Sequence, residues 1–94
     1  MALDQRTWLS VYHALSNRAR LGILILLGEA RLTFSELKQR MNMTDGNLSY
    51  HLDIMFKARL VHNEYVKTEG TGYYSYYELS ELGRRILQEA GLLQ

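Results

Sequence analysis

The chain has 94 residues, of which 47% are hydrophobic, and its 11 basic and 10 acidic residues leave a net charge of +1. This length predicts one domain, residues 1–94, with a single modest core. So small a net charge does not by itself indicate nucleic-acid binding. The sequence contains no cysteine, no secretion signal and no apolar run near the ~20 residues that a membrane-spanning helix needs, so we expect a cytoplasmic protein without disulfides or thiolate metal sites.

Two helices are predicted in the first third of the chain. One extends from Asp4 to Leu15, where apolar residues recur at the spacing of an amphipathic helix: Trp8, Val11, Tyr12 and Leu15. The other follows Asn17, a favourable N-cap, and covers Arg18 to Glu29. Its apolar residues lie on all sides, which predicts a buried central helix. A buried strand is the alternative for so short an apolar run, but the cap and the length of the segment favour a helix.

Two shorter helices joined by a tight turn are predicted next. Thr33 and Glu36 form a capping-box pattern at the start of a helix from Phe34 to Arg40. Thr44 is a further N-cap, and we expect the helix that it opens to cover residues 44–58.

The last third of the chain predicts a β-hairpin and a final helix. Residues 60–68 and 73–79 are rich in β-branched and aromatic residues, and the glycines of Glu69-Gly70-Thr71-Gly72 between them permit a hairpin turn. Ser80 is the N-cap of a helix over residues 81–90. The predicted fold is therefore mainly α with a β-hairpin (α+β), in the order α-α-α-α-β-β-α.

The helix over residues 44–58 has one face suited to reading DNA. One stripe of this helix must face the core: Leu48, Leu52 and Met55. The opposite face is expected to be exposed, and it carries Gly46, Asn47, Tyr50, Asp53, Ile54 and Lys57, with Ser49 and His51 on its flanks. Small and hydrogen-bonding residues near the start of a helix are what the major groove requires, and Asn47 can pair with adenine through two hydrogen bonds. Lys57, at the other end, is expected to meet the phosphate backbone.

Four fragments carry a resemblance to a known group of proteins. They are Ala14-Leu15-Ser16-Asn17-Arg18-Ala19-Arg20-Leu21, then Thr44-Asp45-Gly46-Asn47-Leu48-Ser49-Tyr50-His51-Leu52, then Ala58-Arg59-Leu60-Val61, and Tyr77-Glu78-Leu79-Ser80 with Gly83-Arg84. In order, they resemble the start of the second helix, the recognition helix, the first wing strand and the exit from the wing in winged helix-turn-helix transcriptional regulators of the MarR and ArsR types. The resemblance covers nearly the whole chain.

The resemblance implies a sequence-specific regulator of transcription that binds double-stranded DNA, with repression by occlusion as the simplest outcome. The helix over residues 44–58 then enters the major groove, and the wing, residues 66–74, flanks the DNA. The DNA contacts expected are Thr44, Gly46, Asn47, Ser49, Tyr50, Lys57, Lys67, Thr71 and Tyr73. Two departures are visible. Arg59 stands where such families often have glycine, so either this turn differs or a strain of ~1 kcal/mol is tolerated, and the wing has few cations, which implies moderate affinity for DNA.

Apolar residues remain near both ends of the chain after the core stripes are filled: Leu3, Leu9, Leu92 and Leu93. Leftover apolar surface on terminal helices commonly marks an oligomer interface. Together with the resemblance, it predicts a homodimer that places two recognition helices on a roughly palindromic site. No cofactor is expected, and the sequence identifies no effector.

The histidines and the basic residues also allow plain structural interpretations. His13, His51 and His62 have no metal-ligand spacing and no cysteine partner, so no metal site is expected. His51, at the edge of the apolar stripe, either contacts DNA or packs and hydrogen-bonds inside the protein, and the second interpretation is favoured. Arg18 and Arg20 form one of several basic pairs that together can make a basic face.

The tyrosines of the second strand divide between two faces. Alternation places Tyr77 and Leu79 on the core, while Tyr74 and Tyr76 point the other way, to a groove, a partner surface or solvent.

The sequence also allows a function other than DNA binding. A winged helix can serve protein–protein assembly without reading DNA, because a fold does not fix a function. An enzyme is not expected, since the sequence has no activated nucleophile, no paired carboxylates and no phosphate loop.

Overall fold

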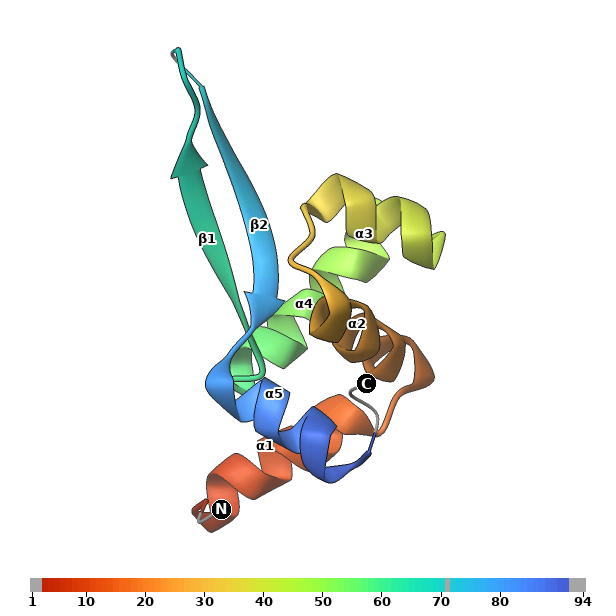
Figure 1. Cartoon of the computed structure of the whole chain (residues 1–94). Coiled ribbons are helices and arrows are strands. Elements are labelled where there is room, and N and C mark those ends of the chain that lie inside the picture. Colours follow the sequence, from red (N-terminus) through yellow and green to blue (C-terminus); the bar gives the residue numbers. More distant parts are fainter. Residues whose placement is uncertain (1–2, 71, 92–94) are drawn as a thin grey trace.

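The computed structural model of the chain describes residues 3–70 and 72–91. The elements follow the predicted order, α-α-α-α-β-β-α: α1 Gln5–Leu15, α2 Arg18–Glu29, α3 Phe34–Met41, α4 Asp45–Lys57, β1 Val61–Lys67, β2 Tyr73–Leu79 and α5 Glu81–Glu89. The helices form one body, with α2 between α3 and α5, and the β1–β2 hairpin projects from this body as a wing (Figure 1). No helix in the described ranges is both long and apolar enough to cross a membrane.

The helices begin where short polar side chains satisfy the free amide groups of the first turn. The predicted N-caps are confirmed, with the predicted capping box present at α3: Asn17, Thr33, Thr44 and Ser80. Asp4, which was expected inside the first helix, lies in front of it instead, and its carboxylate accepts from the amide of Thr7 at 2.7 Å. Amide donors stabilise the charged carboxylate, so they lower the pKa of Asp4 and of Glu36 in the capping box.

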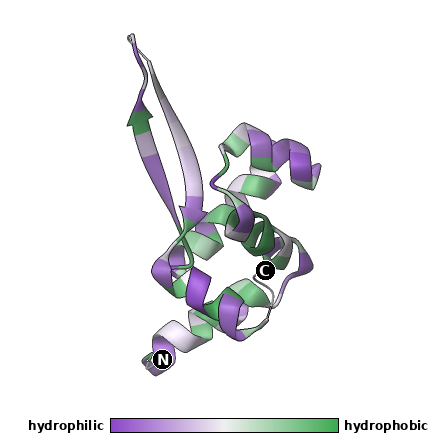
Figure 2. Cartoon of the chain, in the orientation of Figure 1, coloured by the Kyte–Doolittle hydropathy of each residue, from purple (hydrophilic) through white to green (hydrophobic). Residues whose placement is uncertain are grey.

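The core surrounds α2, which is predominantly hydrophobic (Figure 2). Its fully buried residues pack with residues from every other helix: Ile23, Leu24 and Leu27 with Val11, Leu37, Leu48, Leu52, Met55 and Leu87. Two expectations of burial were wrong. Leu21, Ile25 and Leu26 are only half-buried, so α2 is not buried on all sides, and Tyr12 of the predicted apolar stripe of α1 is 66% exposed.

The hairpin is antiparallel, with Val61 opposite Leu79 and Lys67 opposite Tyr73. As predicted, Leu79 is buried and Tyr77 packs on the core. The expectation that Tyr76 is open to a groove, a partner or solvent was wrong, because Tyr76 exposes only 9% of its surface. Arg31, in the connection between α2 and α3, lies 4.3 Å above the Tyr76 ring and donates a hydrogen bond to its hydroxyl at 2.9 Å.

The end of α4 explains why Arg59 is accepted where glycine is usual. Arg59 has φ 63°, in the left-handed region. Its amide donates to the carbonyl of Phe56 and the amide of Leu60 to that of Met55, the two hydrogen bonds of a Schellman motif. Leu60 and Met55 are both fully buried, which adds the apolar contact that accompanies this motif. The turn after α4 therefore does not differ from the usual one. The second alternative holds, in which the protein tolerates the strain of a non-glycine residue in the left-handed region.

The start of α5 is fixed to the same junction. The amide of Ser80 donates to the carbonyl of Leu60 at 2.9 Å, and its hydroxyl donates to the carbonyl of Arg59. Gly83 lies so close that a Cβ atom on it would collide with the Leu60 carbonyl oxygen. Because that oxygen belongs to the backbone, it cannot give way cheaply, and glycine at this position lets α5 pack against the base of the wing.

Gly83→Ala is therefore expected to destabilise the protein. Overpacking of this kind costs about 1–3 kcal/mol, which outweighs the better helix propensity of alanine, up to ~1 kcal/mol. The measurement is the free energy of unfolding from urea denaturation followed by circular dichroism. Gly46→Ala is the matched control, because Gly46 lies in the first turn of α4 and a Cβ there meets nothing within 4 Å. Equal stability of the two variants would contradict the close packing of α5 on Leu60.

Candidate nucleic-acid interface

The two faces of α4 are as different as the sequence predicts. Leu48, Leu52 and Met55 are buried to 4% exposure or less and hold the helix on the core. On the opposite side, the predicted contact residues near the start of the helix are exposed: Thr44, Gly46, Asn47, Ser49 and Tyr50. Tyr50 exposes 60% of its surface. Polar and aromatic side chains thus project into solvent from the start of α4, and the buried residues on its other face hold the helix in this orientation.

Charges on this face are balanced by pairing. Asp45 lies 2.8 Å from Lys38 of α3, and Asp53 lies 3.0 Å from Lys57 one turn further along α4. Exposed pairs contribute only about 0–1 kcal/mol to stability, but they cancel the local charge. Ile54, expected on the exposed face, is half-buried and packs on the core instead. The face therefore offers hydrogen-bonding groups rather than a run of cations.

Of the three residues predicted as DNA contacts on the wing, the structure describes the side chain of one. Lys67 ends β1 and is exposed, and its register partner is the backbone of Tyr73. Thr71 and the side chain of Tyr73 lie outside what the structure describes. Between α4 and the wing is an open hollow of about 260 Å³ lined by Ser49, Leu52, Asp53, Phe56, Asn63 and Tyr77. Ser49 of the predicted site therefore faces the wing across this hollow.

Arg20 connects the candidate interface to the rest of the protein. Although it was expected on a basic face, Arg20 is only 4% exposed. Its Nε donates to the carbonyl of Ala14 at 2.8 Å and its Nη2 to that of His13 at 3.0 Å, at the end of α1. Its Nη1 lies 3.1 Å from Nδ1 of His51, on α4. One buried guanidinium thus ties α1, α2 and α4 together.

His51 accordingly has the internal role that was favoured over DNA contact. A guanidinium can only donate hydrogen bonds, so Nδ1 must accept and the imidazole must be neutral. Burial and the nearby charge of Arg20 both lower the pKa of His51. The Tyr50 ring lies edge-on to the His51 ring at 5.4 Å between centroids, so the internal histidine adjoins an exposed candidate contact.

The spacing of the histidines in the sequence does not predict a cluster of three ionisable side chains on the wing. His62 of β1 lies beside Glu64 of the same strand and Glu78 of β2. The available signal is the alternation of His62 and Glu64 on one strand together with the hairpin register, which places Glu78 opposite His62.

The residues predicted for a dimer interface are only partly described. Leu9 exposes 63% of its surface on α1, beside the 66% exposed Tyr12, and Leu3 is half-buried. Leu92 and Leu93 lie outside the described residues. An apolar surface on α1 is thus present.

Comparison with protein families and curated proteins gives one match. Residues 9–90 match a family described as "Domain of unknown function (DUF7347)". No curated protein matches the chain significantly.

Solved structures similar to this chain are titled as transcriptional regulators, and one of them as a winged helix-turn-helix DNA-binding domain. One is the homodimeric winged helix-turn-helix DNA-binding domain Mb0332 of Mycobacterium bovis, a possible ArsR-family regulator. It is 25% identical to this chain, the match covers 98% of this chain and 88% of that chain, and the TM-score is 0.75. A transcriptional regulator homologue from Pyrococcus horikoshii OT3 has 26% identity, coverage of 86% and 81%, and a TM-score of 0.73. A candidate transcriptional regulator of the MarR family from Enterococcus faecalis V583 has 21% identity, coverage of 97% and 83%, and a TM-score of 0.74. The prediction of a winged helix-turn-helix fold, which these titled MarR- and ArsR-type structures share, is confirmed.

The contact between Arg20 and His51 predicts a pH dependence of stability. Because the pKa of His51 is lower in the folded than in the unfolded protein, the unfolded state binds the proton first as the pH falls below about 6.5. The contribution of His51 to stability is therefore present above that pH and is lost progressively below it. His51→Asn keeps an acceptor near the position of Nδ1 but does not titrate. Urea denaturation across this range should show a steeper loss of stability in the wild type, and identical pH profiles would contradict the contact.

Proposed function

This chain belongs to the DUF7347 family, and we propose that it is a sequence-specific double-stranded DNA-binding regulator of transcription that acts as a repressor. The observation that carries the proposal is the exposed start of α4, where Asn47, Ser49 and Tyr50 project from a helix whose other face is locked in the core. A helix that enters the major groove needs such hydrogen-bonding side chains near its N-terminus to reach base edges.

The connection from α3 to α4 has the form that a helix-turn-helix requires. Asn42, in the left-handed conformation, ends α3, and Thr44 begins α4 two residues later. The ion pair between Lys38 and Asp45 adds a second link across the turn. In such a pair the first helix crosses the DNA backbone and supports the second one in the groove. The titles of similar structures, which name a DNA-binding domain and transcriptional regulators, support the same function.

The wing is placed to contact the DNA backbone next to α4. It follows α4 directly, and Lys67, near its outer end, is available to meet a phosphate. Thr71 and Tyr73 remain proposed contacts of the same kind, and Lys57 is a proposed backbone contact once its pairing with Asp53 is exchanged for phosphate. With so few cations, most of the discrimination comes from α4, and the total affinity is moderate.

A homodimer is the proposed active form. The exposed apolar side chains of Leu9 and Tyr12 on α1 support it, as does the homodimeric state named for the mycobacterial domain. Two-fold symmetry places two α4 helices in successive major grooves, with half-sites roughly 10 base pairs apart. Occupation of such a site near a promoter represses transcription by occlusion.

DNA binding is tested with the Asn47→Ala, Tyr50→Ala double variant. We expect the wild type to select a preferred duplex from a random pool and to bind it in a salt-sensitive way, measured by fluorescence anisotropy at two salt concentrations. Loss of a bidentate base contact costs about 1–3 kcal/mol, so the double variant should lose at least about fivefold in affinity and most of its preference between sequences.

The control variant is Gln88→Ala, which truncates an exposed amide side chain on α5. It should bind the selected duplex as the wild type does. Lys67→Gln should weaken binding to all sequences alike and lower the slope of log affinity against log salt by about 0.9. No binding at low salt, or equal binding by the double variant, would refute DNA reading by α4 and move the weight to protein–protein assembly.

The dimer is tested by analytical ultracentrifugation at micromolar concentration. Leu9→Glu should shift the protein to an 11.0 kDa species, because a carboxylate on an apolar interface is desolvated without a partner. Tyr65→Glu is the matched control, since Tyr65 is 73% exposed but lies on the wing. A wild type that sediments only as the monomer would overturn the proposal.

A further inference from the structure

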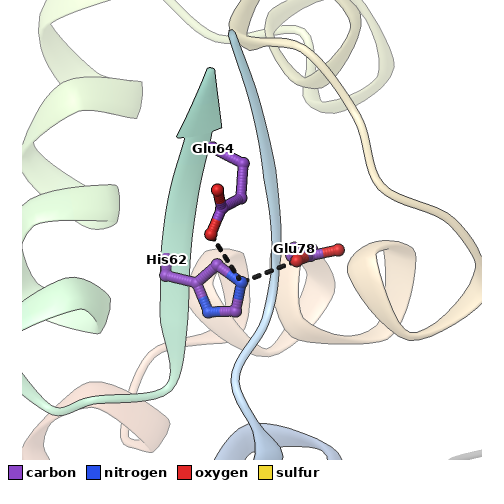
Figure 3. A group of neighbouring side chains, drawn as sticks. All are labelled: His62, Glu64 and Glu78. Carbon is purple, nitrogen blue, oxygen red and sulfur yellow. Dashed lines mark hydrogen bonds and ion pairs between the residues drawn. The ribbon is translucent and has the colours of Figure 1, made fainter. Parts of the chain in front are cut away.

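His62, Glu64 and Glu78 meet on one face of the wing near its base (Figure 3). His62 and Glu64 are two residues apart on β1, so their side chains leave the strand on the same side, and Glu78 is the register partner of His62 on β2. In Figure 3 the His62 ring points between the two carboxylates. Its Nε2 lies 2.7 Å from Oε1 of Glu78 and 3.7 Å from Oε1 of Glu64.

These distances suit a shared cation. The ligand atoms of the three residues all lie within 4.8 Å of one another. In a tetrahedral zinc site with bonds of ~2.0–2.2 Å, neighbouring ligand atoms are roughly 3.3–3.6 Å apart. The two distances from Nε2 of His62 lie on either side of this range, so the Glu78 carboxylate must move away from Nε2 and the Glu64 carboxylate toward it to form such a site. The backbone need not move, because both strands are already paired at the required register.

The ligand chemistry favours a particular class of ion. One imidazole nitrogen and two carboxylate oxygens suit zinc and neighbouring transition metals, whereas magnesium and calcium prefer oxygen ligands alone. Two carboxylates balance the charge of a divalent cation. The side chains of His62, Glu64 and Glu78 are 38%, 52% and 34% exposed, so an ion can reach them from solvent and keep water in its remaining position.

We propose that His62, Glu64 and Glu78 form a binding site for a divalent transition-metal ion, with zinc as the representative, that links the two strands of the wing. The site shares no residue with the proposed DNA contacts, so it stands or falls independently of DNA binding. A bound ion joins β1 to β2 through side chains, in addition to the backbone ladder, and stiffens the part of the wing from which the tip extends.

The experiment is isothermal titration calorimetry of the chelator-treated full chain with zinc chloride at neutral pH. We expect one zinc ion per chain, no competition from an equal concentration of magnesium, and weaker binding at acid pH, because the imidazole must be neutral to bind the metal. Thermal unfolding with and without zinc should show a higher Tm in the presence of the ion, since only the folded hairpin assembles the ligands.

Two variants remove ligands, and two controls leave the site intact. His62→Gln should abolish stoichiometric binding. Glu64→Gln, at the most exposed ligand, should weaken it at least about tenfold, because even the loss of a group that only supports a ligand reduces metal affinity by about 10–100-fold. His13→Gln on α1 and Glu69→Gln beyond the end of β1 remove a similar group elsewhere and should bind zinc as the wild type does. No heat of binding at millimolar zinc, or binding that survives His62→Gln, would overturn the proposal.

Discussion

The position of α4 depends on Arg20, the one charged side chain that is buried in the described part of the chain. Its guanidinium donates to two carbonyls at the end of α1 and to the neutral ring of His51 on α4. Its backbone amide, in the first turn of α2, donates to the side chain of the Asn17 cap. Hydrogen bonds to a charged group are stronger than neutral ones, about 1.5–3 kcal/mol each, which offsets the cost of removing the guanidinium from water. The orientation of α4 is thereby fixed relative to α1.

The two ends of α4 are held by different means. At its start, the Thr44 cap and the pair between Asp45 and Lys38 fix the helix against α3. At its end, the Schellman motif at Arg59 turns the chain into β1, and Gly83 lets α5 pack on the Leu60 carbonyl. A helix anchored at both ends and along its apolar stripe presents its remaining face in one fixed geometry. Such preorganisation is what a side-chain reading of base edges requires, because a positional error of about 1 Å loses a hydrogen bond.

Local signals predict the elements of this fold well, and non-local contacts explain where they fail. Caps and apolar periodicity identify the helices because both act within a few residues, as at Asn17 and Thr33. From the sequence, Arg20 is expected to be an exposed charge, because its burial depends on α1, α2 and α4, which meet only in the folded chain. Alternation misplaces Tyr76 because Arg31, 45 residues away, covers the outer face of the strand. The cluster at His62 needs the hairpin register, which histidine spacing does not contain.

DNA contact by the exposed start of α4 and by the wing can be measured by mapping the contact surface in solution. Amide chemical shifts of the labelled protein would be followed by NMR during titration with a duplex selected from a random pool. We expect the changes to concentrate at residues 44–50 and near Lys67, while the amide shifts of α5 around Gln88 stay unchanged. Changes concentrated on α1 and α5, or a failure of any duplex to perturb α4, would contradict this contact.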